Sequence, residues 1–414
     1  MNEPQESQTA DITPPSLPGR LRELAALFLK LGAISFGGPA AHIALIEVEI
    51  VRKRQWVTRQ QFLDMLGATN LIPGPTSTEL AINVGFVRAG WIGLCVAGAS
   101  FILPAALITG AFAWAYVRFG TLTQAMSALE GIKAAVIAVI AIAIWRLGRV
   151  AVKNVGLAVL GVISLGAFFL GVNPIAILFG GGVTGMLGRQ LGSTRGASSL
   201  LFSASSRVFS VTWKSALSAT LLRWVGVAAV ASSAAAAVAR PSLVRIGLFF
   251  LKIGAVLYGG GYVLLAFLEQ GLVRQHAWLT QQQLLDAVAI GQFTPGPVLS
   301  TATFIGYILG GVPGAAVATV GIFLPSFFYV ALLAPVLFQL RQSAWIAAFL
   351  DSVNVCAVAL MAGVTFRLAA DALRGWHDWA VALTALAVLL RWKVSPAWVV
   401  LGGGVVGLLL AAHH

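Results

Sequence analysis

Charge and cysteine are both scarce in this sequence. Charged residues fill only 10% of the 414 positions and hydrophobic residues fill 58%, so no soluble arrangement could hide that much apolar surface behind so little polar cover. The two cysteines, Cys95 and Cys356, lie in apolar segments and do not occupy matching positions of the internal repeat described below. The scarcity of charge excludes a soluble protein, and the placement of the cysteines disfavours a disulfide or a metal pair.

Motifs of catalysis and nucleotide binding are missing as well. The sequence contains no zinc-protease signature, nucleophile elbow, phosphate-binding P-loop or dinucleotide fingerprint. His42 and the terminal His413 and His414 show no metal-ligand spacing with other His, Cys or acidic residues. We therefore expect no enzyme, no cofactor and no metal site. The sequence also lacks the nucleotide-binding motifs that ATP-driven pumping needs.

Acidic residues are outnumbered by basic ones, 14 to 27, which gives a net charge of +13. The basic residues gather at the ends of apolar segments and in one linker, where the cytoplasmic loops of membrane proteins collect Lys and Arg. A nucleic-acid surface would need a solvated basic face, and no soluble segment here is long enough to supply one. We expect the lipid bilayer as a partner and no nucleic acid.

Long apolar stretches recur along the whole chain. Several approach or exceed the ~20 residues that a spanning helix needs, and none shows the ten-residue alternation of an outer-membrane barrel. The first 19 residues are polar and are predicted to form a disordered tail without a cleavable signal peptide. The sequence therefore predicts an all-α polytopic protein of the cell inner membrane. The stretches are Leu94–Tyr116, Ala134–Trp145, Val155–Leu170, Ile246–Leu268 and Val312–Leu340.

The chain contains two related halves, because residues 24–187 match residues 246–409 at a nearly fixed offset of 222. Gly85, Pro104 and Arg146 recur as Gly306, Pro325 and Arg367 after a slip of one residue. A match this ordered does not come from shared apolar composition alone. We divide the chain into a tail (1–19), a first repeat (20–187), a linker with an extra span (188–240) and a second repeat (241–414).

The linker bears on the orientation of the second repeat. Its apolar stretch Ala216–Val238 is long enough to cross the membrane once, and that extra crossing would turn the second repeat upside down. The loop Arg52–Arg59 is strongly basic, whereas Gln275 and His276 replace two of its cations in the second repeat. Positive charge is retained inside and lost outside, so we favour inverted repeats, which are common among transporters.

Each repeat interrupts its apolar segments twice with residues that break helices. In hydrocarbon, unwound backbone is tolerated only where it is buried in protein or lines a water-filled cavity. Four breaks in register predict one central site, although close helix packing would also use small residues. The breaks are Gly37-Gly38-Pro39 and Pro73-Gly74-Pro75 in the first repeat, and Gly259-Gly260-Gly261 and Pro295-Gly296-Pro297 in the second.

The breaks carry groups suited to a small tetrahedral oxyanion. Proline is preferred at the first position of a helix, so Pro39, Pro75 and Pro297 each indicate the start of a half-helix. The free N–H groups at helix N-termini bind phosphate-like anions. Hydroxyl and amide side chains lie beside the Pro-Gly-Pro motifs: Thr76, Ser77, Thr78, Ser300 and Thr301 after them, and Asn70 and Gln292 three residues before them.

Lys30 and Lys252 recur inside the first apolar segment of each repeat, about two turns before the glycine break. An ionisable residue in the membrane is a functional candidate, so we interpret both as substrate-binding, although snorkelling would also explain Lys30. Glu79 has no counterpart and is the candidate for proton coupling. Arg146 and Arg367 lie at the ends of apolar runs, where topology explains them. The recurring acidic pairs are candidates for neutralising buried cations or carrying protons, and structural ion pairs explain them at least as well: Glu47 and Glu269, Asp64 and Asp286, Glu130 and Asp351.

The order of Phe36-Gly37-Gly38-Pro39, Glu47, Arg54-Gln55-Trp56 and Pro73-Gly74-Pro75 resembles the duplicated domain of the chromate ion transporter family, in its long two-domain form. The resemblance extends from Leu24 to Leu409. It implies an inner-membrane protein that exports chromate from the cytoplasm and confers chromate resistance, with sulfate as the structural mimic. Gly261 stands where the first repeat has Pro39, which weights the expected site toward the first repeat.

Two alternatives stay open at this point. One is uptake or exchange of sulfate or a related oxyanion, and the other is a membrane enzyme or scaffold, which the missing motifs disfavour. The sequence leaves open the energy source, the direction of transport and whether the chain works as a homodimer.

Overall fold

The computed structural model describes residues 16–36, 38–69, 71–120, 123–192, 241–258, 263–333, 344–392 and 394–412. Across these ranges the secondary structure is helical and includes no strand, which confirms the predicted all-α class. Four of the predicted site residues, Gly37, Asn70, Gly259 and Gly260, lie outside the described residues. The predicted extra span of the linker lies outside them too.

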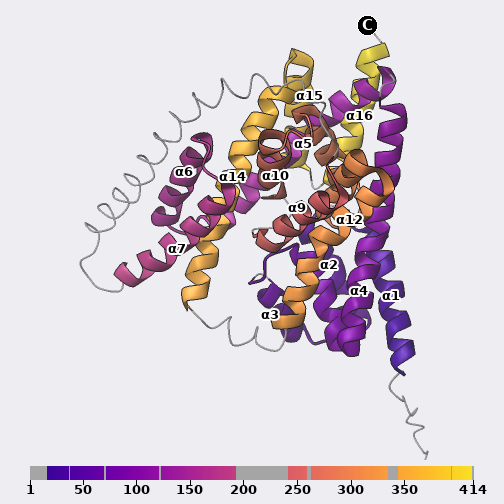
Figure 1. Cartoon of the computed structure of the whole chain (residues 1–414), viewed down its shortest axis with the longest axis vertical. Coiled ribbons are helices and arrows are strands. Elements are labelled where there is room, and N and C mark those ends of the chain that lie inside the picture. Colours follow the sequence, from indigo (N-terminus) through magenta and orange to yellow (C-terminus); the bar gives the residue numbers. More distant parts are fainter. Residues whose placement is uncertain are drawn as a thin grey trace, which may run out of the picture.

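The helices follow one another in the same order in both halves (Figure 1). In each half a long helix leads into a short one, a π-helical turn, a third helix, a long kinked helix and three more helices. The duplicated architecture is therefore confirmed. The first half contains α1 (Leu17–Ile34), α2 (Pro39–Glu47), the π-helix η1 (Val48–Lys53), α3 (Arg59–Thr69), α4 (Thr76–Phe119), α5 (Thr123–Ala151), α6 (Val155–Phe169) and α7 (Pro174–Gly192). The second half contains α9 (Leu243–Val256), α10 (Leu264–Leu268), the π-helix η3 (Glu269–Gln275), α11 (Gln281–Phe293), the 3-10 turn η4 (Val298–Ser300), α12 (Thr301–Leu333), α14 (Ala344–Ala372), α15 (Trp376–Arg391) and α16 (Pro396–Ala412).

The two halves match in local detail. Gln55 and Ala277, 222 residues apart, both adopt positive φ, at 51° and 49°. The helices that follow begin with the same reciprocal cap, in which a threonine and the glutamine three residues later exchange side-chain and backbone hydrogen bonds. Such a cap satisfies donors that a helix N-terminus otherwise leaves free. The sequence repeat therefore encodes one supersecondary unit twice.

The kinks of α4 and α12 turn each of them into a helical hairpin. Ala89 and Gly90 leave the helical region at the same φ and ψ as Gly310 and Gly311, to within 4°. A Cβ built on Gly85 would lie 2.2 Å from the carbonyl oxygen of Gly93, a contact possible only if the two arms lie against each other. The first arm of α4, residues 76–88, rises about 20 Å, less than the ~30 Å of a hydrocarbon core. It is the predicted half-helix.

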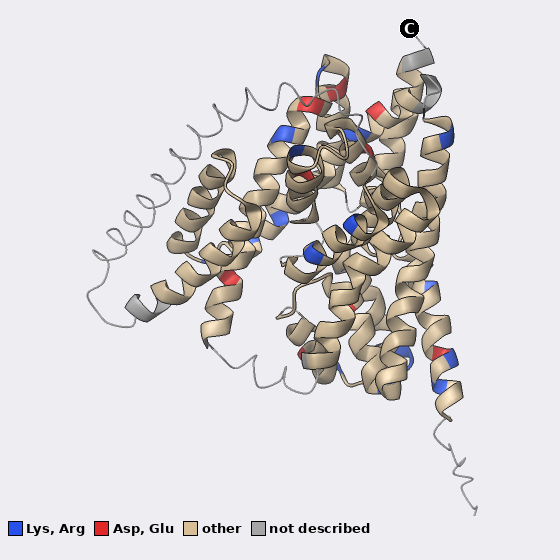
Figure 2. Cartoon of the chain, in the orientation of Figure 1, with Lys and Arg blue, Asp and Glu red and all other residues tan. Residues whose placement is uncertain are grey.

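Four helices are long and apolar enough to cross a membrane, which supports a multi-pass membrane protein. Large apolar side chains cover their outer surface, where Trp91 is 61% exposed and Leu107 is 65% exposed. Figure 2 shows few charged residues along the length of the long helices. The four candidate spans are Thr76–Phe119, Met126–Ala151, Val298–Leu332 and Trp345–Ala372.

The two halves interlock rather than standing apart. Helix α5 of the first half packs against α15 and α16 of the second, and α14 of the second packs against α6 and α7 of the first. In Figure 1, α14 lies beside α6 and α7, away from α1 and α4. The kinked helices α4 and α12 contact each other directly. This exchange of partners brings the breaks of both halves to the middle of the molecule.

Candidate functional site

The Pro-Gly-Pro turn of each repeat is bonded to the residue that follows the first helix of the other repeat. The N–H of Gly74 donates to the carbonyl of Leu257 at 2.7 Å, and the N–H of Gly296 donates to the carbonyl of Ser35 at 2.8 Å. Ser35 and Leu257 follow α1 and α9 at equivalent positions, so the two bonds are mirror images. The Pro-Gly-Pro turn of each repeat is thus tied to the end of the first helix of the other repeat.

Both turns require glycine at their centre. Gly74 has a φ of +144° and Gly296 one of +91°, a region that residues with a side chain rarely adopt. A Cβ on Gly74 would lie 2.2 Å from Oε1 of Glu79 and 2.6 Å from Oγ of Ser326. Space and backbone conformation therefore act together, and each glycine lets two segments approach closely. Because their amides already donate to carbonyls, Gly74 and Gly296 themselves offer no free N–H to a ligand.

Several buried polar side-chain atoms on the segments that flank the breaks have no partner among the described residues. In the described part of the chain, five side-chain oxygens of Ser35, Thr78, Glu79 and Ser326 are buried and have no hydrogen-bond partner. Glu79 and Ser326 are 0% exposed, so this set is closed to solvent. Buried polar groups in native structures are nearly always paired, with protein, water or a ligand. We call Ser35, Ser77, Thr78, Glu79 and Ser326 the polar cluster.

His42 connects the parts of this cluster. It lies in α2 and is 1% exposed. Its Nε2 lies 3.1 Å from the carbonyl oxygen of Ser35, which also accepts from Gly296, and its Nδ1 lies 3.3 Å from Oγ of Ser77. Burial lowers the pKa of His42 to about 4, against a smaller raising effect of the hydrogen bond to Ser35. The sequence analysis considered His42 only as a metal ligand and missed this role, although a lone His beside a break was the available signal.

The mirror-image region of the second repeat keeps the buried hydroxyls of Ser300 and Thr301 but has no histidine. Leu257 and Leu264 stand at the positions of Ser35 and His42, and Ala105 stands opposite Gly296 where Ser326 stands opposite Gly74. No carboxylate follows the second Pro-Gly-Pro motif within α12. Glu79 and Ser326 lie at the crossing of Gly74 with Leu257. Ser35 and His42 lie at the crossing of Gly296 with Ser35, so the polar cluster draws on both crossings.

The predicted helix starts differ slightly from those observed. Pro39 is the first residue of α2, as predicted, but Pro75 and Pro297 directly precede the first helical residue. The N–H groups of Thr78 and Glu79 donate to the carbonyl of Pro75 at 2.8 and 3.1 Å, which closes the first turn. Gly38, Thr76 and Gln292 are half-buried beside the breaks, whereas Pro73 and Pro295 are buried in them.

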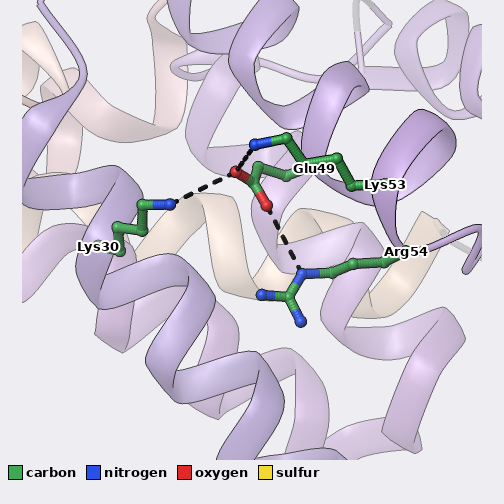
Figure 3. Close-up of polar contacts among 4 residues, drawn as sticks. All are labelled: Lys30, Glu49, Lys53 and Arg54. Atoms are coloured by element: carbon green, nitrogen blue, oxygen red, sulfur yellow. Dashed lines mark hydrogen bonds and ion pairs between the residues drawn. The ribbon is translucent and has the colours of Figure 1, made fainter.

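Lys30 lies in a cationic group on the first repeat rather than among the polar cluster (Figure 3). Its Nζ is 3.5 Å from Oε1 of Glu49, which Lys53 approaches at 2.9 Å, while Arg54 lies 3.7 Å from the other carboxylate oxygen. The hydrogen bond from Lys53 lowers the pKa of Glu49, and Lys30 adds to this effect. Three cations thus share one carboxylate, and positive charge remains in excess.

Lys252 has lost these partners. It is exposed and lines a small pocket together with Gln270, Gly271 and Gln275. Gly271 and Gln275 stand where the first repeat has Glu49 and Lys53. The two predicted lysines therefore occupy equivalent places with different electrostatic surroundings.

A buried ion pair escaped the sequence analysis. Nζ of Lys133 in α5 lies 2.8 Å from Oδ1 of Asp286 in α11, with the two side chains 6% and 4% exposed. The hydroxyl of Tyr116 donates to Oδ2 of Asp286 at 2.8 Å. Lys133 has no charged counterpart, because Asn354 stands at its mirror position. A lysine inside an apolar stretch was the signal that could have revealed it.

Glu269 forms a second buried group in η3. Its carboxylate is 1% exposed and pairs with Arg274 and Arg367. Arg367 in α14 also lies over the ring of Phe168 at 4.3 Å. This arrangement assigns Glu269, Arg274 and Arg367 to a structural network, one of the two readings that the sequence left open.

A groove between α5, α15 and α16 encloses about 510 Å³. Its lining is almost wholly apolar and includes Trp376, Val381, Val388 and Trp398, but no residue of the four breaks. Such a surface does not suit a doubly charged oxyanion, since burying an unpaired charge is costly. The groove therefore does not compete with the polar cluster as the candidate site.

Comparison with known proteins gives the same picture of a duplicated chain. The family model described as chromate transporter matches residues 22–186 and 244–408. The chromate transport protein of Cupriavidus metallidurans is 33% identical over 424 residues, which cover all of both chains, and the probable chromate transport protein of Synechococcus elongatus is 34% identical over 91% of each. The uncharacterized transporter YwrB of Bacillus subtilis is 32% identical over 38% of this chain and 79% of its own. No solved structure shows a significant match.

Proposed function

This chain belongs to the chromate transporter family, and we propose that it exports chromate from the cytoplasm through the polar cluster beside Gly74. The observation that carries the proposal is the set of buried oxygens of Ser35, Thr78, Glu79 and Ser326, which have no hydrogen-bond partner in the described part of the chain. A transporter of the inner membrane with this activity would confer chromate resistance on its cell.

The cluster has the chemistry that a tetrahedral dianion needs. The hydroxyls of Ser35, Thr78 and Ser326 are donors without partners among the described residues, and they surround the start of the half-helix 76–88. The first amides of a helix lack intrahelical acceptors, and the helix dipole adds a partial positive charge there. Hydrogen bonds to a charged group contribute about 1.5–3 kcal/mol each, so a few suffice to hold an oxyanion.

Glu79 is the residue that couples binding of the substrate to binding of a proton at this site. A carboxylate beside a dianion repels it, so Glu79 must be neutral while chromate is bound. Its carboxylate lies beside Gly74, and no described residue forms an ion pair or a hydrogen bond with its oxygens. We therefore assign to Glu79 the proton that moves with the substrate, as its isolated position in the sequence predicts.

Access to the closed cluster requires that one repeat move against the other. Inverted repeats would allow this by rocking around a fixed centre. We propose that the loop 52–59 is cytoplasmic and the loop 274–281 periplasmic. Single cysteines placed in each loop of a protein lacking Cys95 and Cys356 should react with an impermeant reagent from opposite sides. Reaction from the same side would exclude the inverted arrangement.

The test of the function is transport into everted membrane vesicles, whose interior corresponds to the outside of the cell. Vesicles containing the protein should take up labelled chromate down its concentration gradient faster than vesicles that lack the protein, and excess sulfate should compete. Gly110 lies on α4 with open space around its Cα, so Gly110→Ala serves as a matched control for Gly74→Ala. Accumulation of sulfate but not chromate would replace chromate by sulfate as substrate, and no accumulation of either would contradict the proposal.

A further inference from the structure

His42 occupies the point at which three of the four breaks meet. Its Nε2 faces the carbonyl of Ser35 in the first break, and that carbonyl also accepts the N–H of Gly296 from the other repeat. Its Nδ1 faces the hydroxyl of Ser77 at the start of the half-helix. The edge of the ring packs against Phe101 at 5.9 Å between centroids. The ring is thus held on every side without any charged partner among the described residues.

These contacts determine where the hydrogens lie. A carbonyl oxygen only accepts, so Nε2 of His42 carries a hydrogen. α2 is nine residues long and does not span the membrane, and burial lowers the pKa of His42 to about 4, so near pH 7 the ring is neutral. Nδ1 then has no hydrogen and must accept one from Ser77. The Ser77 hydroxyl therefore points its hydrogen at the ring and leaves only lone pairs for the polar cluster.

This orientation is the wrong one for an oxyanion, which needs donors. We propose that His42 is a positioning residue that sets the polarity of Ser77: a proton on Nδ1 reverses their hydrogen bond and turns the Ser77 hydrogen toward the bound oxyanion. The inference rests on the proposed function and adds a second proton-linked group to it. Atoms balance, because the ring gains one proton from solvent and the serine keeps its own.

The other titratable groups near His42 do not take part in its hydrogen bond with Ser77. Glu79 lies on the same half-helix as Ser77 but two residues on, and its carboxyl lies beside Gly74. Tyr258, at the end of α9, interacts with Glu79 and Tyr329. The ring also contacts Ser35, which follows α1, and Ser77 and Phe101 of α4, none of which titrates. Leu264 stands at the mirror position, so the second repeat has no such device.

Protonation of His42 and binding of the oxyanion must then favour each other, because each stabilises the state that the other prefers. The measurement is chromate affinity and proton uptake of the purified full-length protein in weakly buffered detergent solution from pH 6 to pH 8. Chromate itself gains a proton in this range, so variants are compared with wild type in the same solutions. His42→Gln keeps one donor for Ser35 and one acceptor for Ser77 but does not titrate.

We expect wild type to take up more protons on binding chromate than His42→Gln does. For each unit by which the pH falls, the chromate affinity of wild type should rise about tenfold more than that of His42→Gln. Ser77→Ala, in which His42 remains, should lose affinity at pH 6 and change little at pH 8. Glu79→Gln should lose the proton that Glu79 takes up on binding. The additional proton uptake that depends on His42 should remain. Equal proton uptake in wild type and His42→Gln would overturn the inference, as would a Ser77→Ala loss independent of pH. If wild type binds no chromate at any pH, the proposed function fails instead.

Discussion

The amide of Gly74 and the carbonyl of Leu257 are joined by a 2.7 Å hydrogen bond that ties the Pro-Gly-Pro turn of one repeat to the end of α9 in the other. Its mirror image joins Gly296 to Ser35. Two such bonds make the centre of the molecule the place where both repeats depend on each other's unwound backbone. A change of conformation that opens the polar cluster must either move these bonds as a unit or break them.

Alanine at Gly74 should abolish chromate transport while the protein still inserts into the membrane. The strain of a side chain at this φ costs about 1–3 kcal/mol, and the added Cβ would displace Glu79 and Ser326. Gly296→Ala should have a weaker effect, since it meets the methyl of Ala105 and no ligand group. Transport into everted vesicles at matched expression measures both, with Gly110→Ala as control. Normal transport by Gly74→Ala would assign the breaks to helix packing.

Replacing Lys30 by Gln should weaken apparent chromate affinity several-fold at low salt and have little effect at high salt. Lys30 is 57% exposed and shares Glu49 with two other cations, so its attraction for an anion is long-range and screened, with a Debye length of about 8 Å at physiological salt. Lys252→Gln should have a smaller effect because Gly271 and Gln275 leave it outside any cationic group. Initial uptake rates against chromate concentration at two ionic strengths decide this. Unchanged affinity in both variants would show that both lysines only extend to the membrane interface and do not attract the substrate.

Breaking the Lys133–Asp286 pair should destabilise the protein far more than breaking an exposed pair. Removing one partner of a buried pair costs about 3–5 kcal/mol, because the other charge stays buried. Lys153 and Asp351 are as close, at 2.7 Å, but 57% and 33% exposed, and exposed pairs contribute about 0–1 kcal/mol. Thermal unfolding in detergent should therefore separate Lys133→Met from Lys153→Met. Equal unfolding temperatures for these two variants would show that water reaches Asp286.

The pKa of His42 predicts a pH-dependent stability. Its folded-state value of about 4 lies below the ~6.5 of an unfolded chain, so the unfolded state binds more protons between these values. Stability should fall as the pH drops through this window, by about 3 kcal/mol in total. His42→Leu, which copies Leu264, should lack this contribution. The difference between wild type and His42→Leu in unfolding temperature, measured from pH 7 to pH 4.5, tests it, and a difference that does not change with pH would refute it.

A bound dianion would favour the protonated form of His42 over the neutral form. At an effective dielectric near 20 and a distance of about 6 Å, two negative charges stabilise a proton on the ring by about 5 kcal/mol. Protonating a group of pKa 4 at pH 7 costs about 4 kcal/mol. The attraction exceeds the cost, so His42 can stay neutral in the empty protein and still carry a proton when chromate is present.

The sequence predicted the architecture well, because a membrane constrains the length of apolar segments and the places where helices break. Apolar length gives the spans, and Gly and Pro give the breaks, whatever surrounds them. The offset of 222 residues gave the repeat before any element was known. The kinks at Gly90 and Gly311 were less visible, since a glycine within an apolar run is also a common packing residue.

The contents of the site were harder to predict, since they depend on contacts between residues far apart in the chain. Ser326 belongs to the polar cluster only because α12 packs against α4, and Lys133 is paired only because α5 meets α11. Lys30 recurs in both repeats and lies in the membrane pattern, yet it faces Glu49 rather than the breaks. Recurrence showed which positions the duplication kept, whereas the polar cluster and His42 arose from positions at which the two halves differ.

The most direct test of the central claim is the position of bound chromate. Diffraction data from crystals grown with chromate, collected at the chromium absorption edge, locate the metal atom of the anion by its anomalous signal. We expect one peak beside Gly74, within hydrogen-bonding reach of Ser77 and Ser326. A peak instead beside Gly296, between Lys30 and Arg54, or in the groove lined by Trp376 and Trp398 would contradict the account.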